Sequence, residues 1–226
     1  MPQKPPHKLR FAILATDVVL FTIEDGLLKV LLAPVHRPPH YIHTWGVPGG
    51  LIKPAETADK AAMRILREKA RVRSNVYLEQ LYTFSDVKRD PRGRVVSVAY
   101  FGLVSSGTLR QEDRREDSAR WCAIGELPAL AFDHTEMIRV AIKRLRSKLE
   151  YTNIVYGLLP REFTMSELQY TYEIILGRPL DKRNFRRKLL ELKLVQKAGR
   201  KRRGGAHRPA ELYRFVHRTP KIVAVL

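Results

Sequence analysis

The stretch Gly49–Val72, GGLIKPAETADKAAMRILREKARV, constrains the fold more than any other part of the chain. Its two leading glycines permit backbone conformations that other residues avoid, and Pro54 stiffens the loop that follows. After Pro54 the stretch contains no glycine or proline and is rich in helix formers. Because Ala58, Ala62 and Leu66 recur at four-residue spacing, they are expected to face a core. We therefore expect a loop that leads directly into an amphipathic helix.

The same stretch resembles the Nudix box, whose pattern is Gly, five residues, Glu, seven residues, then Arg-Glu-apolar-x-Glu-Glu-x-Gly-apolar. The positions that match at the right spacing are Gly50, Glu56, Arg64, Leu66, Glu68 and Val72. Ile65 and Lys69 stand where the family has helix glutamates, and Arg71 replaces the glycine. The resemblance implies the α/β class, with the Nudix α/β/α sandwich in the N-terminal part.

The departures from the box concern the metal. In active Nudix proteins the glutamates hold Mg²⁺ or Mn²⁺ against a pyrophosphate, because hard cations need several carboxylate oxygens. On a helix, positions 65, 68 and 69 fall within a sector of roughly 140°. Here Ile65 is neutral, Glu68 is negative and Lys69 is positive, which strongly disfavours tight metal binding. We expect no metal, no cofactor and no catalytic residue.

Charge points to a polyanionic partner. The 226 residues include 42 Lys and Arg against 23 Asp and Glu, a formal net charge of +19. Residues 151–226 hold 17 basic and 6 acidic residues, and residues 181–208 hold 12 basic and 2 acidic ones. The alternative, a basic surface that serves solubility alone, does not account for this concentration in one segment.

Other features of the composition suggest a cytoplasmic protein. No apolar run approaches the roughly 20 residues of a membrane span. The first ten residues lack the apolar core of a signal peptide. Cys122 is the single cysteine, so neither a disulfide framework nor a zinc site is expected, and we interpret it as a small core residue at the end of a strand.

Apolar and β-branched runs alternate with turn signals on both sides of the box. We expect strands at residues 9–22, 27–32, 76–84, 95–104 and 118–123, and a second helix at residues 135–149. The segment 34–41 contains three prolines and is expected to be a loop. Interleaved strands and helices indicate an α/β arrangement.

The polar segment Asp86–Arg94 is a surface turn by default, but its arginines also suit a phosphate ligand. Arginine binds diphosphates bidentately, and both interpretations stay open for each of Arg89, Arg92 and Arg94. The run of residues 86–101 and the string LAFDH at 130–134 resemble segments of ADP-ribose-type Nudix proteins. His134 is given no catalytic role. The residues expected to line an effector cleft are Glu56, Arg64, Glu68, Arg89 and Arg92.

The C-terminal part has the element order of a winged helix-turn-helix. Residues 164–167 form a capping box that begins one helix, and Gly177 ends it. Asp181 caps a second helix that continues to about Leu194. Two short strands, 194–197 and 212–216, are expected to pair as a hairpin with a basic tip at 199–205. A further short helix is expected at 150–159.

The second helix has an apolar face and a basic face. Arg183 and Arg187 lie nearly opposite Phe185 on the helical wheel. In a winged helix this helix enters the major groove, and the wing lies along phosphates. The expected DNA contacts are Lys182, Arg183, Asn184, Arg186, Arg187 and Arg203. A solvated basic face is the alternative, and RNA is a weaker one, because the A-form groove is too narrow for a helix.

The strings FTMSELQYTYEIILGRPLDKRNFRRKLLELKLV and GAHRPAELYRF, at 163–195 and 205–215, resemble the C-terminal domain of the Nudix-related transcriptional regulators. The match extends over essentially the whole chain beyond the first ten residues. The resemblance implies a Nudix-like domain, residues 1–150, that senses ADP-ribose or a related NAD metabolite. It also implies a winged helix, residues 151–226, that binds palindromic double-stranded operator DNA as part of a homodimer.

We therefore expect a bacterial repressor with a catalytically degenerate Nudix domain. The alternative is an active ADP-ribose pyrophosphatase with an appended DNA-binding domain. That alternative requires Glu68, with help from Glu56, to hold enough metal by itself.

Overall fold

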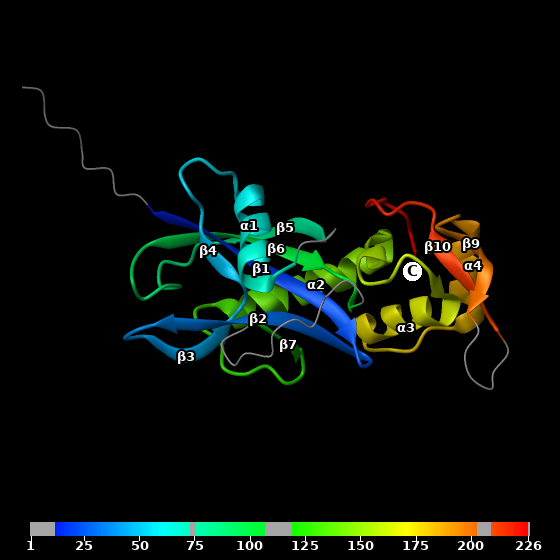
Figure 1. The fold of residues 1–226 in the computed structure, drawn as a ribbon, viewed down its shortest axis with the longest axis horizontal. Helices are drawn as coiled ribbons and strands as arrows, with labels where there is room; N and C mark the ends of the chain where they lie inside the picture. Colours follow the sequence, from blue (N-terminus) through cyan, green and yellow to red (C-terminus); the bar gives the residue numbers. More distant parts are fainter. Residues whose placement is uncertain (1–11, 73–75, 107–118, 203–208, 226) are drawn as a thin grey trace, which may run out of the picture.

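The computed structural model describes residues 12–72, 76–106, 119–202 and 209–225, and Figure 1 shows how its elements are arranged. A mixed sheet dominates the N-terminal part, with the strand order β3-β2-β1-β6-β5; β4 pairs with β1, and β7 pairs with β2. The strands are β1 (Ile13–Glu24), β2 (Leu27–Arg37), β3 (Tyr41–Gly46), β4 (Gly49–Leu51), β5 (Tyr77–Phe84), β6 (Val95–Leu103) and β7 (Arg120–Ala123).

Helices cover both faces of this sheet. Side chains alternate along β1, so Val18 and Leu20 join one apolar cluster with Leu66 of α1 (Ala58–Ala70). Their neighbours Val19 and Phe21 join the opposite cluster, which includes the buried face of α2 (His134–Tyr151). This layering confirms the predicted α/β/α sandwich.

The helix of the Nudix-type stretch begins later than the sequence suggests. Thr57 caps α1, because its side chain accepts a hydrogen bond from the Lys60 backbone amide at 3.3 Å. At the other end, Arg71 adopts φ 51°, the left-handed conformation. That conformation explains why the family pattern has glycine here.

The segment 34–41 was predicted to be a loop, and that prediction is wrong. β2 continues to Arg37 and pairs with β3, so only a short turn containing the cis Pro38–Pro39 bond separates them. Pro34 is tolerated because β2 pairs with β7 only as far as Leu32, and a strand position paired on one side accommodates proline.

The C-terminal module is a winged helix. It comprises the 3₁₀ helix η2 (Ile154–Gly157), β8 (Phe163–Thr164), α3 (Met165–Leu176), α4 (Lys182–Glu191), β9 (Val195–Arg202) and β10 (Ala210–Phe215). Its three described strands pair in the order β8-β10-β9. The predicted capping box is confirmed, since Thr164 and Glu167 exchange both hydrogen bonds. Gly177 ends α3 at φ 70°, and Asp181 caps α4, as predicted.

Two other predictions for this module need correction. The short helix predicted for residues 150–159 does not form, because α2 runs on to Tyr151 and only one 3₁₀ turn follows. The Asn153 side chain is used at this point to hold the C-terminal segment, accepting a hydrogen bond from the Lys221 amide at 2.7 Å. β9 is also longer than predicted and includes residues expected to form the wing tip.

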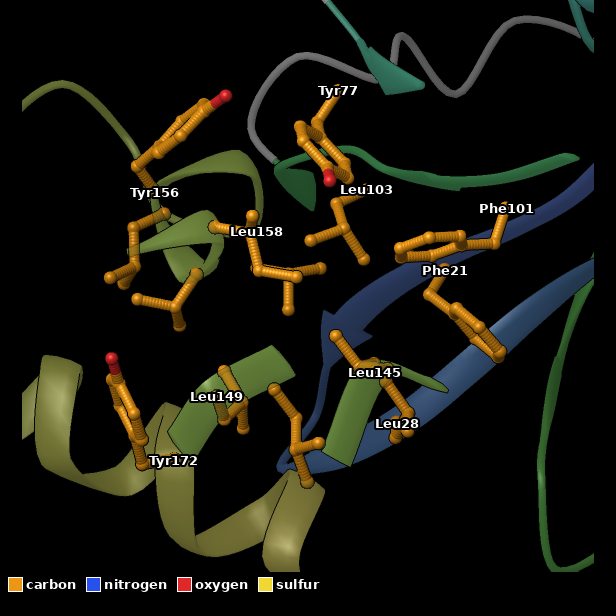
Figure 2. Close-up of a cluster of buried hydrophobic side chains, with 14 of the residues drawn as sticks. Phe21, Leu28, Tyr77, Phe101, Leu103, Leu145, Leu149, Tyr156, Leu158 and Tyr172 are labelled. Atoms are coloured by element: carbon orange, nitrogen blue, oxygen red, sulfur yellow. The ribbon is translucent and has the colours of Figure 1, made fainter. Parts of the chain in front are cut away.

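A common core joins the two parts of the chain (Figure 2). Tyr77 of β5 packs edge-on against Phe101 of the large sheet, with ring centroids 5.7 Å apart. Tyr77 also packs against Tyr156 of η2 at 6.1 Å, and Tyr156 packs against Phe215 of β10 at 6.3 Å. A chain of aromatic rings therefore connects the Nudix-type sheet to the wing.

Candidate effector cleft and DNA-binding surface

Arg64 organises the acidic residues of the box. It lies 2.6 Å from Glu56 and 3.1 Å from Glu68, and it also donates to the Leu51 carbonyl at 2.9 Å. The hydrogen bond from Arg64 is the main cause that lowers the pKa of Glu56 to about 2. The structure thus brings Glu56, Arg64 and Glu68 together, but both carboxylates are engaged by the same guanidinium.

The two remaining positions of the Nudix cluster do not fit a divalent cation. Ile65 is buried, with 1% of its surface exposed, and its Cδ1 would lie 3.4 Å from a Cβ at Gly50. The Lys69 ammonium donates a hydrogen bond to the Gly49 carbonyl. Among the residues that the structure describes, no three His, Cys, Asp or Glu side chains gather closely enough to hold a metal ion.

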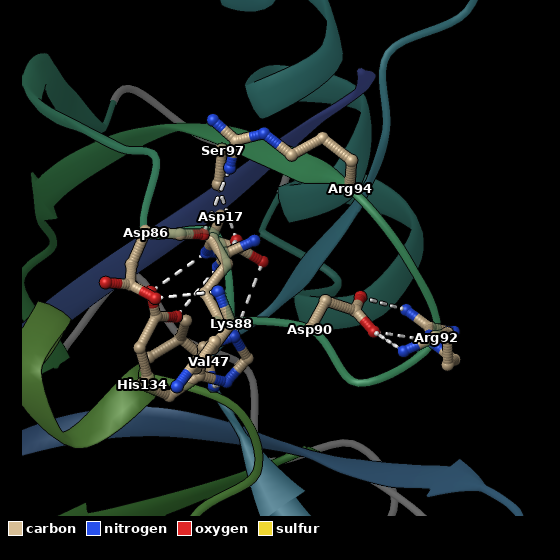
Figure 3. Close-up of polar contacts among 11 residues, drawn as sticks. Asp17, Val47, Asp86, Lys88, Asp90, Arg92, Arg94, Ser97 and His134 are labelled. Carbon is tan, nitrogen blue, oxygen red and sulfur yellow. Dashed lines mark hydrogen bonds and ion pairs between the residues drawn. The ribbon is translucent and has the colours of Figure 1, made fainter. Parts of the chain in front are cut away.

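A second polar cluster lies around Asp17 of β1 (Figure 3). The Arg89 side chain is almost fully buried and forms two hydrogen bonds with Asp133, at 2.7 and 2.8 Å. It also lies 3.6 Å from Asp17, which accepts a hydrogen bond from Ser97 at 2.6 Å. Arg89 thus lies between two carboxylates, and its guanidinium is already paired with Asp133.

His134 completes this cluster at the first turn of α2. Its Nδ1 accepts a hydrogen bond from the Val47 amide at 3.1 Å, and its Nε2 lies 3.7 Å from Asp17. Burial lowers the pKa of His134. Gly49 is required above the cluster, because a Cβ there would lie 1.7 Å from an Asp17 oxygen.

Arg92, from the same loop as Arg89, lies beside Asp90 and away from the cluster around Asp17 (Figure 3). Its side chain is 42% exposed and pairs with Asp90 at 2.7 Å, and its guanidinium lies 5.3 Å from the Phe132 ring centre. Arg94 donates instead to the carbonyls of Ser85 and Asp86. The loop arginines therefore differ in role, and a ligand contact by Arg89 or Arg92 remains a prediction.

Sequence reasoning passed over Asp17 and Arg37 as site residues. Asp17 lies within the apolar run of β1, where its burial is visible only once the sheet forms. Arg37 was assigned to a loop, but it ends β2, close enough to Lys69 for its charge to lower the pKa of that ammonium. The polar residue inside an apolar strand was the available signal for Asp17.

The exposed face of α4 carries the cations predicted to contact DNA. Phe185 and Leu189 are buried, and the Phe185 ring packs against Tyr172 of α3 at 5.0 Å. Arg186 donates to the Tyr213 hydroxyl at 3.0 Å, which ties α4 to the wing. The exposed residues of this face are Lys182, Arg183, Asn184, Arg186 and Arg187. Arg203 lies outside the described residues.

Together, a Nudix-type sandwich and a winged helix with an exposed cationic second helix define a DNA-binding regulator with a sensor domain. Family models support both parts: a NUDIX domain matches residues 13–142, and the NrtR DNA-binding winged helix domain matches residues 155–215. No described helix has the length and apolar character needed to cross a membrane.

Comparison with known proteins gives the family. The ADPR responsive transcriptional repressor NtrR of Acinetobacter baylyi is 35% identical over 207 residues, covering 90% of this chain and 82% of the relative. Shewanella oneidensis NrtR in complex with a 27mer DNA superposes with a TM-score of 0.81 at 36% identity, covering 89% and 93% of the two chains. The Nudix domain of that protein in complex with ADP ribose gives a TM-score of 0.54 at 35% identity, covering 63% and 94%. The chain belongs to the NrtR family of Nudix-related transcriptional regulators.

Proposed function

We propose that this protein is a repressor that binds a palindromic operator as a homodimer and releases it when ADP-ribose or a related NAD metabolite binds the Nudix-type domain. The observation that carries the DNA-binding part is the two-sided character of α4. Phe185 and Leu189 are buried, with the Phe185 ring against Tyr172 of α3, while the arginines of the helix are exposed. An exposed cationic helix of this kind suits the major groove, and the basic wing suits the neighbouring phosphates.

ADP-ribose is proposed as the effector because one relative is an ADPR responsive repressor and the Nudix domain of another forms a crystal complex with ADP ribose. For the ligand to act, it must bind the DNA-free arrangement more tightly than the DNA-bound one. The predicted division into a sensor, residues 1–150, and a DNA-binding domain, residues 151–226, is part of this proposal.

We also infer that the cleft does not hydrolyse its ligand. Arg64 engages both Glu56 and Glu68, and the other two helix positions carry an isoleucine and a lysine. The rival enzyme hypothesis is tested by incubating the protein with ADP-ribose and Mg²⁺ or Mn²⁺ and measuring AMP release. Turnover that disappears in Glu68→Gln would favour the enzyme.

The DNA-binding assignment is tested by replacing two arginines of α4. Duplexes are selected from a random-sequence pool with the wild-type protein, and affinity is measured by gel shift. We expect Arg183→Ala/Arg187→Ala to bind the selected duplex at least tenfold more weakly, since one bidentate arginine–base contact contributes about 1–3 kcal/mol. Lys60→Ala/Lys143→Ala removes the same charge from exposed positions on α1 and α2 and serves as the control. Equal binding by both double variants would reject the assignment.

A further inference from the structure

The Lys69 ammonium is directed back toward the glycine-rich loop. It donates a hydrogen bond to the carbonyl of Gly49, the glycine that lies directly against the Asp17 carboxylate. A lysine ammonium has three N–H donors, so two remain after this contact. Among the described residues, no carboxylate forms an ion pair with it. Lys69 therefore combines a fixed position with unused positive charge.

Arg64 and Arg89, the central cations of the two polar clusters, differ from Lys69 in this respect. Arg64 pairs with Glu56 and Glu68, and Arg89 pairs with Asp133. A ligand diphosphate that displaced either pair would leave carboxylates without a partner, which is costly for the largely buried Asp133–Arg89 pair. Lys69 offers its charge without breaking an ion pair.

The neighbourhood of Lys69 favours an anion. Burial lowers the pKa of the ammonium and the positive charge of Arg37 lowers it further, while the Asp17 and Glu68 carboxylates raise it without cancelling the shift. The net lowering indicates that the negative charge nearby does not fully balance the ammonium, and a bound anion would add to that balance. Arg37 belongs to β2 and Lys69 to α1, so the two cations approach from different elements.

We propose that Lys69 takes over the role of the divalent cation, so that the diphosphate of the effector binds this ammonium directly and needs no metal ion. This inference rests on the proposed effector function and adds the residue that recognises the charged part of the ligand. A covalently attached cation holds a diphosphate in place, but it lacks the open coordination positions with which a metal activates water. The same lysine thus accounts for both binding and inactivity.

The experiment measures ADP-ribose affinity by calorimetry, once in EDTA and once in Mg²⁺. We expect wild-type protein to bind equally well in both buffers. Lys69→Met, which keeps most of the side-chain length and removes the charge, is expected to bind at least tenfold more weakly. Lys60→Met removes an exposed lysine from the first turn of the same helix and should bind as wild type does.

A charge reversal separates recognition from a purely structural role of the Gly49 contact. Lys69→Glu should bind ADP-ribose more weakly than Lys69→Met in EDTA, because a carboxylate repels the diphosphate. Melting temperatures of the unliganded variants establish that each one folds.

The outcomes are distinguishable. Wild-type protein that binds ADP-ribose only in Mg²⁺, or a Lys69→Met variant with unchanged affinity, would overturn the lysine site and leave the effector proposal standing. Equal losses in Lys69→Met and Lys69→Glu would also overturn it. Wild-type protein that binds ADP-ribose in neither buffer would overturn the effector proposal and the lysine site together.

Discussion

The surroundings of His134 favour the neutral form of its imidazole. Its Nδ1 accepts a hydrogen bond from a backbone amide, so that nitrogen carries no proton, and the imidazole is buried against Asp17 and Arg89. A protonated ring would lose the Val47 contact and place a further positive charge beside Arg89. The neutral form is therefore part of the folded structure.

This environment makes stability depend on pH. The pKa of His134 is lower in the folded protein than its unfolded value of about 6.5, so below that pH the unfolded chain takes up a proton that the folded chain does not. We expect the free energy of unfolding, measured by urea denaturation, to fall as the pH decreases from 7 to 5. His134→Gln should show a smaller decrease. An equal slope in the variant would contradict this account.

At the scale of elements, the helix ends marked by a capping residue or glycine are predictable, and the contacts between elements are not. Thr164, Gly177 and Asp181 specify their helix ends through local hydrogen bonds and backbone conformation, so the sequence alone identifies them. The continuation of β2 to Arg37 depends on its hairpin pairing with β3, and this pairing outweighed a proline-rich composition. Similarly, pairing of the β9–β10 hairpin extended β9 beyond its apolar residues.

The candidate cleft divides in the same way. The contact of Arg64 with Glu68 follows from their four-residue spacing, whereas its contact with Glu56, which precedes the helix, required the structure. The engagement of Arg89 by Asp133 could not be predicted, because the two residues are 44 positions apart and meet only through the fold. The residue types suggested a cation-rich site, but which carboxylate each cation contacts could be learned only from the structure.

The junction between the sheet and η2 leaves no room at Gly157. A Cβ there would lie 2.8 Å from the Leu103 Cβ and 3.3 Å from the Tyr77 Cβ, atoms that move only with their backbones. We expect Gly157→Ala to destabilise the protein by about 1–3 kcal/mol through overpacking. Gly125→Ala, whose Cβ would meet nothing within 4 Å, should change stability by less than about 0.5 kcal/mol in the same denaturation assay. Equal effects of the two substitutions would disprove the steric argument.

The larger of the two buried clusters extends through both parts of the chain. Phe21 and Phe101 of the large sheet belong to the same cluster as Tyr172 of α3 (Figure 2). Phe215 of β10 belongs to it as well. The C-terminal segment strengthens this junction, since Arg218 donates to the Tyr156 and Leu159 carbonyls. Packed side chains therefore form a continuous connection from the large sheet to the winged helix.

A continuous core should make unfolding a single cooperative event. Both tryptophans, Trp45 and Trp121, belong to the N-terminal part, so their fluorescence reports on that part alone. Circular dichroism at 222 nm reports on helices of both parts. We expect the two signals to give the same urea midpoint. A separate transition in circular dichroism, without a fluorescence change, would show that the winged helix unfolds independently.

The central claim is that binding of the ligand to the Nudix-type domain weakens binding of the operator by the winged helix. Fluorescence anisotropy of a labelled duplex, selected as described above, tests it when the wild-type protein is titrated with and without saturating ADP-ribose. By thermodynamic linkage, preferential binding of the ligand to the DNA-free form must weaken DNA binding by the same factor. The account predicts at least tenfold weaker DNA binding in ADP-ribose, and identical affinities under both conditions would contradict it.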